Sequence, residues 1–122
     1  MAIKYGILLI YSASPISQGE WITSRVILNA DGKLETESQI NNETFKKIYF
    51  LSPDWFIVTP RNSFNKAIPP LPENKHPEQL FALTQRPDTT IWFLGNSKYE
   101  RNQWIEHILP FITLKLPTPE DR

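Results

Sequence analysis

The chain has 122 residues, which is the usual size of a single domain and enough to bury a core without disulfide bonds. Its 13 Lys and Arg residues balance 13 Asp and Glu residues, and this neutrality argues against a nucleic-acid-binding domain that neutralises phosphates in bulk. The absence of cysteine excludes a disulfide framework, thiol catalysis and Cys-based zinc or iron–sulfur sites.

The first third of the chain predicts three strands. Residues 3–12 alternate with the period of a strand, and they are strongly apolar. Residues 12–19 contain a proline, a glycine and three serines, and they predict a loop. A second alternating run at 21–28 leads into the turn Asn29-Ala30-Asp31-Gly32, and alternation resumes at 33–38. This pattern predicts a β-hairpin around Gly32.

Four further strands are predicted downstream, at 45–51, 55–59, 80–85 and 89–94. The stretch 65–79 is rich in proline, which withholds ladder hydrogen bonds, so we expect an exposed loop there. Its segment Pro69-Pro70-Leu71-Pro72 has a second interpretation as a polyproline II helix that aromatic-grooved modules could recognise. Both interpretations stay open at the level of sequence.

A single helix is predicted at residues 97–109. Ser97 and Glu100 have the spacing of a capping box, and Trp104 and Ile108 recur at helical spacing. Pro110 should end or kink the helix because it cannot donate a hydrogen bond to the carbonyl of the residue four positions earlier. We expect one domain over residues 1–112 and a C-terminal tail at 113–122.

The order of these elements and several short motifs resemble the pleckstrin homology (PH) domain family. The motifs are GILL at 6–9, GEW at 19–21, VILNADGKL at 26–34, TIWFLGNS at 90–97 and ERNQWIEHI at 100–108. The likeness covers roughly residues 3–112. It implies a mainly β fold, a seven-stranded, partly open antiparallel barrel of two near-orthogonal sheets capped by the C-terminal helix. Trp104 and Ile108 would then be structural residues that plug one end of the barrel.

Many PH domains bind phosphoinositide head groups through a Lys late in the first strand and a basic pair early in the second. The resemblance places these positions at Ile10 and near Thr23 and Ser24, which are uncharged, although a shift of one residue would place Arg25 at the basic pair. We therefore expect the usual inositol-phosphate pocket to be degenerate. Cations gather instead at 44–66, after an acidic segment at 31–43. The candidates for binding a lipid or another anion are Arg25, Lys46, Lys47, Arg61 and Lys66.

The resemblance implies a non-enzymatic targeting or interaction module of an intracellular signalling or adaptor protein. Such a module would dock to an anionic, phosphoinositide-containing membrane or, with more weight, to a protein partner. The alternative is a peptide-binding module of the same superfold, similar to phosphotyrosine-binding domains, that uses the sheet edge beside the helix through Tyr99, Ile105 and Phe111.

No catalytic or metal-binding pattern is apparent in the sequence. It has neither a G-x-S-x-G nucleophile signature nor a glycine-rich phosphate loop, and its two histidines do not form a metal-binding pair. We therefore expect no enzyme activity, no cofactor, no metal and no nucleic-acid partner. The expected location is the cytoplasm, with peripheral recruitment to a membrane, and the chain is expected to be one domain of a larger protein.

Overall fold

The computed structural model describes residues 1–14, 17–60, 68–85 and 89–113, and these form seven strands and one α-helix. The elements are β1 (Ala2–Ser14), β2 (Ser17–Asn29), β3 (Lys33–Ile40), β4 (Glu43–Phe50), β5 (Trp55–Val58), the 3-10 turn η2 (Pro77–Gln79), β6 (Leu80–Gln85), β7 (Thr89–Leu94) and α1 (Lys98–Ile112). The mainly β architecture with one C-terminal helix is therefore confirmed.

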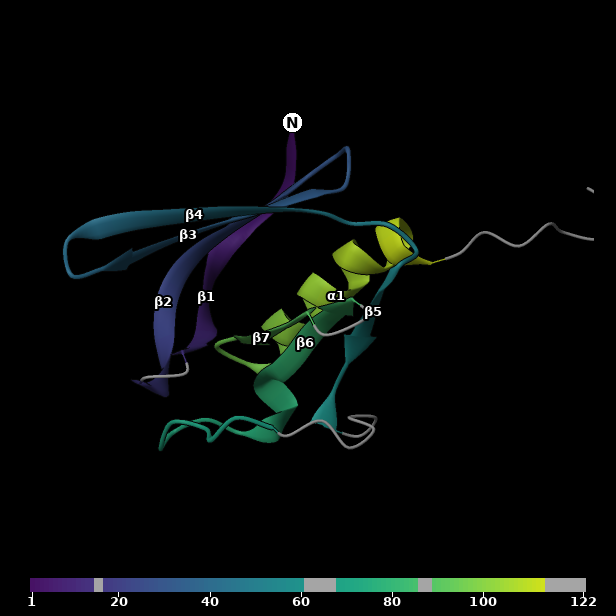
Figure 1. Cartoon of the computed structure of the whole chain (residues 1–122). Helices are drawn as coiled ribbons and strands as arrows, with labels where there is room; N and C mark the ends of the chain where they lie inside the picture. Colours follow the sequence, from purple (N-terminus) through teal and green to yellow (C-terminus); the bar gives the residue numbers. More distant parts are fainter. Residues whose placement is uncertain (15–16, 61–67, 86–88, 114–122) are drawn as a thin grey trace, which may run out of the picture.

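The strands pair antiparallel in the order β4-β3-β2-β1-β7-β6-β5. Between β1 and β7 the pairing is limited to Leu9 with Leu94 and Ile10 with Phe93. This narrow junction divides the sheet into a β1–β4 half and a β5–β7 half, which cross as two layers with α1 beside them (Figure 1). Strands β4 and β5 form the two sheet edges, so the barrel is only partly closed.

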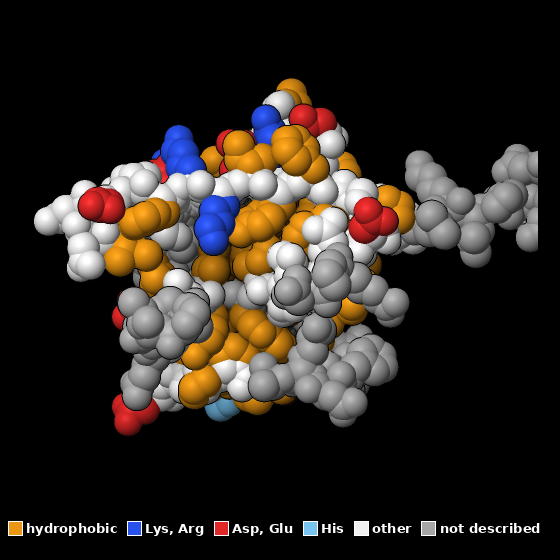
Figure 2. Space-filling view, in the orientation of Figure 1, with side chains coloured by type: hydrophobic (Ala, Val, Ile, Leu, Met, Phe, Trp, Pro, Cys, Tyr) orange, Lys and Arg blue, Asp and Glu red, His pale blue; other side chains and the backbone are white. Residues whose placement is uncertain are grey.

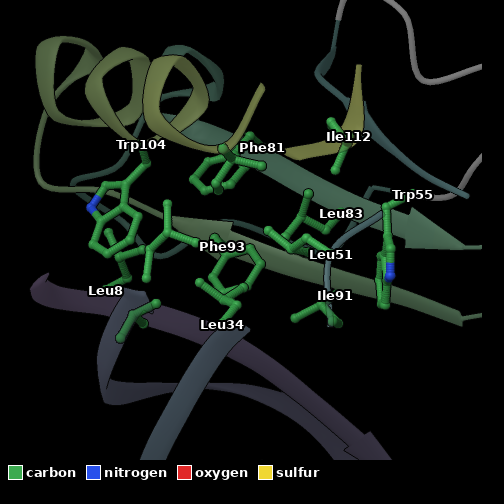
Figure 3. Close-up of a cluster of buried hydrophobic side chains, with 13 residues drawn as sticks. Leu8, Leu34, Leu51, Trp55, Phe81, Leu83, Ile91, Phe93, Trp104 and Ile112 are labelled. Carbon is green, nitrogen blue, oxygen red and sulfur yellow. The ribbon is translucent and has the colours of Figure 1, made fainter. Parts of the chain in front are cut away.

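The main core lies between the two layers and α1. Trp104, Ile108 and Ile112 recur at intervals of four residues and form the buried stripe of the helix. Figure 3 shows Trp104 and Ile112 directed from the helix toward the strands, with Phe81 and Phe93 between the layers. Those two phenylalanine rings stack with centroids 5.0 Å apart. Trp104 and Ile108 are each 1% exposed, as expected for structural residues of the core.

Gly6 allows β1 to approach the helix closely. A Cβ atom on Gly6 would lie 3.3 Å from Cζ2 of Trp104, so a larger side chain there would push the indole away from the strand. Gly32 has a different role, since its φ of +88° closes the predicted β2–β3 turn in a conformation that favours glycine. Gly6 therefore serves the packing of α1 against β1, and Gly32 serves the β2–β3 turn.

A second apolar cluster lies on the opposite face of β5–β7. It consists of Val58, Leu80, Ala82, Trp92 and Leu94, with Leu9, Tyr11, Trp21 and Leu71 packed against it. The Trp21 indole N–H donates a 2.8 Å hydrogen bond to the carbonyl of Pro70, and Pro69 is buried. The proline-rich segment is thus part of the folded domain, which disfavours its interpretation as a ligand for aromatic-grooved modules.

One boundary prediction was wrong. Residues 12–19 were expected to form a loop, but β1 and β2 continue through most of them, with Ser12 opposite Glu20 and Ser14 opposite Ser17. Ladder pairing with a neighbouring strand overrides the weak strand preference of serine and glycine. The predicted loop at 65–79 has no strand in its described part, 68–79, and its last residues, Pro77–Gln79, form the 3-10 turn η2. Residues 65–67 lie outside the described ranges.

The helix also runs three residues beyond its predicted end. Pro110 lies in its last turn, where the missing N–H removes one helical hydrogen bond, and burial of Ile112 offsets that loss. The backbone N–H of Thr113 donates to the carbonyl of Leu109 and closes the end. No helix in the described ranges is long and apolar enough to cross a membrane.

The predicted capping box is half formed. The backbone N–H of Glu100 donates to Ser97 Oγ at 3.0 Å, as expected. The reciprocal bond from the Ser97 backbone to the Glu100 carboxylate is missing, because Glu100 Oε1 is buried without a partner and Oε2 faces the Asn96 amide at 3.5 Å. The N-terminus of α1 is therefore capped by the serine alone.

Replacing Trp104 with Ala is expected to lower the free energy of unfolding by about 3–5 kcal/mol, because the change empties the contact between α1 and β1. Urea denaturation followed by circular dichroism measures this loss. Leu109→Ala is the control on the same helix, since Leu109 is 42% exposed and its truncation should cost less than about 1 kcal/mol. Equal losses for both variants would contradict the assignment of Trp104 to the core.

Replacing Trp21 with Phe keeps an aromatic ring over the second cluster but removes the hydrogen bond to Pro70. We expect faster tryptic cleavage at Lys75 relative to the rest of the chain, because that bond holds the neighbouring segment on the sheet. Trp55→Phe is the matched control, since the Trp55 indole N–H donates to the Phe50 carbonyl at 3.1 Å, away from this segment. Unchanged cleavage in Trp21→Phe would argue against the tether.

Candidate functional site

A groove of about 500 Å³ opens between the inner faces of β1–β4 and strand β7. Its apolar walls are Ile10, Ile22, Ile40, Phe45, Tyr49 and Ile91. Ile40 and Phe45 flank the β3–β4 turn, and Ile91 lies near the start of β7, so we call this site the open-end groove. Figure 2 shows hydrophobic side chains in the hollowed middle of this face, below the β3–β4 hairpin.

The polar groups of the open-end groove are hydroxyls and one cation. Lys47 is the one charged side chain among the described residues that line it, and the hydroxyl residues are Tyr11, Ser12, Thr36, Ser38, Tyr49 and Thr90. Burial raises the pKa of Tyr49, so its hydroxyl stays protonated at neutral pH and is able to donate a hydrogen bond. The Tyr49 ring meets that of Trp55 edge-on, with centroids 5.8 Å apart. The groove therefore combines apolar walls with a single positive charge.

The three positions at which the resemblance expects cations lie in different environments. Ile10 lines the open-end groove, as does Ile22, the residue before the expected basic pair. Thr23 is exposed on the other face of β2. Ser24 is buried, and its hydroxyl lies 2.6 Å from that of Ser38. None of these residues brings a cation to the groove.

The candidate cations do not form one cluster. Arg25, Glu37 and Lys46 are cross-strand neighbours on the outer face of β2–β4, and Lys46 Nζ lies 3.5 Å from a carboxylate oxygen of Glu37. Lys47 points to the inner face because neighbouring residues of a strand alternate between faces. Arg61 lies outside the described residues. The same holds for Lys66.

The charge segregation seen along the sequence is partly cancelled in space. The acidic segment that includes Glu35 and Glu37 forms β3, and the basic residues Lys46 and Lys47 lie on β4, which pairs with it along eight residues. Glu35 also accepts a 2.7 Å hydrogen bond from the amide of Asn29. Hairpin pairing thus brings Lys46 of the basic segment beside Glu37 of the acidic segment.

The outer face of β1–β4 carries a set of exposed apolar side chains that the sequence reasoning missed. We call Tyr5, Ile7, Ile48 and Phe50 the outer-face patch; their exposed fractions are 62%, 46%, 51% and 71%. Tyr5 and Ile48 belong to one cross-strand row through β2 and β3, and Ile7 belongs to the adjacent row. The sequence did contain a signal for this patch. Strand β1 is apolar at both alternating sets of positions, whereas a strand with one buried face alternates apolar and polar residues.

The three peptide-binding candidates on α1 face in different directions. Tyr99, Ile105 and Phe111 are spaced by six residues, which places them about 120° apart around a helix of 3.6 residues per turn. Tyr99 is 63% exposed, Ile105 packs against the main core, and Phe111 lies against the turn at Gly32. The structure does not bring them together beside β5.

Titratable side chains in the described ranges offer no metal centre. No group of three or more His, Asp or Glu residues there is arranged to hold an ion. His107 Nδ1 lies 2.7 Å from the Gln103 carbonyl within the helix, and His76 is exposed beside η2. These two histidines have separate surroundings.

Comparison with solved structures identifies the fold. The C-terminal PH domain of pleckstrin, solved in complex with D-myo-Ins(1,2,3,5,6)P5, aligns over 93% of this chain and 97% of its own, with a TM-score of 0.61 and 15% identity. The PH domain of ArhGAP27 aligns over 90% and 99%, with a TM-score of 0.62 and 13% identity.

A human relative gives the same result. The PH domain of pleckstrin homology domain-containing protein family A member 5 aligns over 97% of this chain and 82% of its own, with a TM-score of 0.59 and 16% identity. No protein-family model and no curated protein matches the sequence. The chain therefore has the PH-domain fold. At these sequence identities the likeness establishes the fold and not the function.

Proposed function

We propose that this chain is a non-enzymatic docking module of an intracellular signalling or adaptor protein and that it binds a protein partner through the outer-face patch. The observation that carries the proposal is the exposure of four large apolar side chains, between 46% and 71% each, on the outer face of β1 and β4, which β2 and β3 separate. Large apolar side chains that are exposed on one face and bordered by polar residues are typical of interaction sites. A module of this type recruits its parent protein to a binding partner and does not catalyse a reaction.

The charges around the outer-face patch favour a protein over an anionic membrane. Arg25 and Lys46 flank Glu37 in one cross-strand row, and Glu35 lies in the adjacent row, so positive and negative groups are interspersed across the surface. A membrane of anionic lipids would attract Arg25 and Lys46 and would repel the two glutamates. A protein partner can match both signs with its own side chains and cover the apolar residues.

We further propose that the usual inositol-phosphate pocket is degenerate. Several phosphate groups need several charge-assisted hydrogen bonds, and the described lining of the open-end groove offers one cation, Lys47. Ile10 stands where the resemblance expects a lysine. Anionic membranes are then a weak, salt-dependent second contact made by scattered surface cations.

Liposome co-sedimentation tests the degenerate pocket. At equal total lipid charge, liposomes with phosphoinositides and liposomes with phosphatidylserine should bind the chain within about twofold of each other, because no cluster of cations distinguishes them. Binding to both should weaken as the salt concentration rises. A preference of about tenfold or more for phosphoinositides, equivalent to a single charge-assisted hydrogen bond, would overturn this part of the proposal.

Photo-crosslinking in cells tests the protein-docking surface. A photoreactive phenylalanine analogue at Phe50 should yield discrete adducts with another protein, whereas the same analogue at Leu109, 42% exposed on α1, should not. Ile48→Asp should abolish the adducts at position 50 and leave the free energy of unfolding within about 0.5 kcal/mol, since the side chain is half exposed on an edge strand. Equal crosslinking at both positions, or adducts that survive Ile48→Asp, would contradict the proposal.

A further inference from the structure

We propose that the open-end groove binds a single-chain amphiphile with one negative charge, of the chemical class of a medium- or long-chain fatty acid. The groove lies on the inner face of the β1–β4 half, whereas the outer-face patch lies on the other face of the same strands. The inference therefore concerns a second surface and does not depend on the protein-docking function.

The walls of the groove suit an apolar body. Ile10, Ile22 and Ile40 are half-buried, and Phe45 is 45% exposed, so each keeps apolar surface that an occupant would remove from water. The volume of about 500 Å³ falls within the range of small-molecule sites, roughly 300–1,000 Å³. An acyl chain is long, flexible and apolar, and it fits an open trough of this kind.

The charge of the groove suits one anionic group. Lys47 is exposed and belongs to no ion pair in the described part of the chain, and no carboxylate lines the groove there. Its neighbour Lys46, on the opposite face, already lies near Glu37. Lys47 can therefore pair with a carboxylate on a ligand, while the protonated hydroxyl of Tyr49 offers a hydrogen-bond donor on the same wall.

Other occupants fit these features less well. A multiply phosphorylated head group carries several negative charges, and the described lining of the groove offers one cation to pair with them. It would also leave the isoleucine walls exposed to water. A second copy of this chain would have to place an acidic group against Lys47 and an apolar group against Ile22. These alternatives predict different outcomes in the experiment below.

The test is an NMR titration of the intact chain with decanoate and dodecanoate below their critical micelle concentrations, with decanol as the uncharged counterpart of decanoate. Decanoate should shift the signals of Ile10, Ile22 and Ile91 more than those of Tyr5 and Ile48. Affinity should rise by about two- to fourfold per added methylene, the upper value corresponding to full burial of the group. Decanol should bind more weakly than decanoate.

Two matched variants isolate the charge. Lys47→Met keeps the length of the side chain and should weaken decanoate binding by about two- to fivefold, the scale of a partly exposed ion pair, while leaving decanol binding unchanged. Lys46→Met is the control one residue away and should leave both affinities unchanged. Melting curves of the two variants establish that both remain folded.

Four outcomes would overturn the proposal. The first is equal loss of decanoate binding in Lys47→Met and Lys46→Met, and the second is the mapping of the shifts to the outer-face patch. The third is displacement of decanoate by a soluble inositol polyphosphate, which would assign the groove to phosphate. The fourth is concentration-dependent dimerisation that Phe45→Ser abolishes, which would assign it to a second copy. Crosslinking at Phe50 is a separate readout, so failure of either proposal leaves the other standing.

Discussion

The fold depends on the contact between Trp104 of the helix and strand β1. Among the described residues the two halves of the sheet share two residue pairs, Leu9 with Leu94 and Ile10 with Phe93, so the β-ladder alone holds them together weakly. Trp104 packs where Gly6 lets the helix approach the strand, and the Lys4 ammonium lies 5.1 Å from the centre of the indole ring. Through this residue α1 joins β1 to the layer that contains Phe81 and Phe93, and the domain becomes one cooperative unit.

The position of the helix also determines which surfaces remain open. Because α1 fills one end of the space between the layers, the other end stays open and forms the open-end groove. The outer face of β5–β7 is covered by Trp21 and Leu71, with the proline-rich segment held by the bond to Pro70. In the described part of the chain no comparable segment covers the outer face of β1–β4, where the apolar residues of the outer-face patch remain exposed.

The sequence was sufficient for the features set by local chemistry. Gly32 indicated its turn, strands β6 and β7 were placed at their observed bounds, and the spacing of Trp104 and Ile108 identified the core stripe of the helix. It failed where tertiary partners decide: the pairing of Ser12 with Glu20 converted an expected loop into strand, and burial of Ile112 carried the helix past Pro110.

The candidate site was predicted less well because charge was counted along the chain. The strand period of two already separates Lys46 from Lys47, and the helical period separates Tyr99 from Ile105. Geometry of this kind was available from the sequence once the elements had been assigned. The pairing of acidic β3 with basic β4, by contrast, needed the sheet order, which only the structure provides.

Strand β4 is an edge strand that contributes to both proposed binding surfaces, the outer-face patch on one face and the open-end groove on the other. Lysines on an edge strand protect it from pairing with other chains, and this protective role would account for Lys46 and Lys47 equally well. It does not account for their different surroundings, since Lys46 lies beside Glu37 while Lys47 lines an apolar groove without a carboxylate in its described lining. A general solubility role treats the two residues alike, whereas a ligand in the groove interacts with Lys47 alone. The difference in surroundings between Lys46 and Lys47 therefore favours a ligand site over a role in edge protection alone.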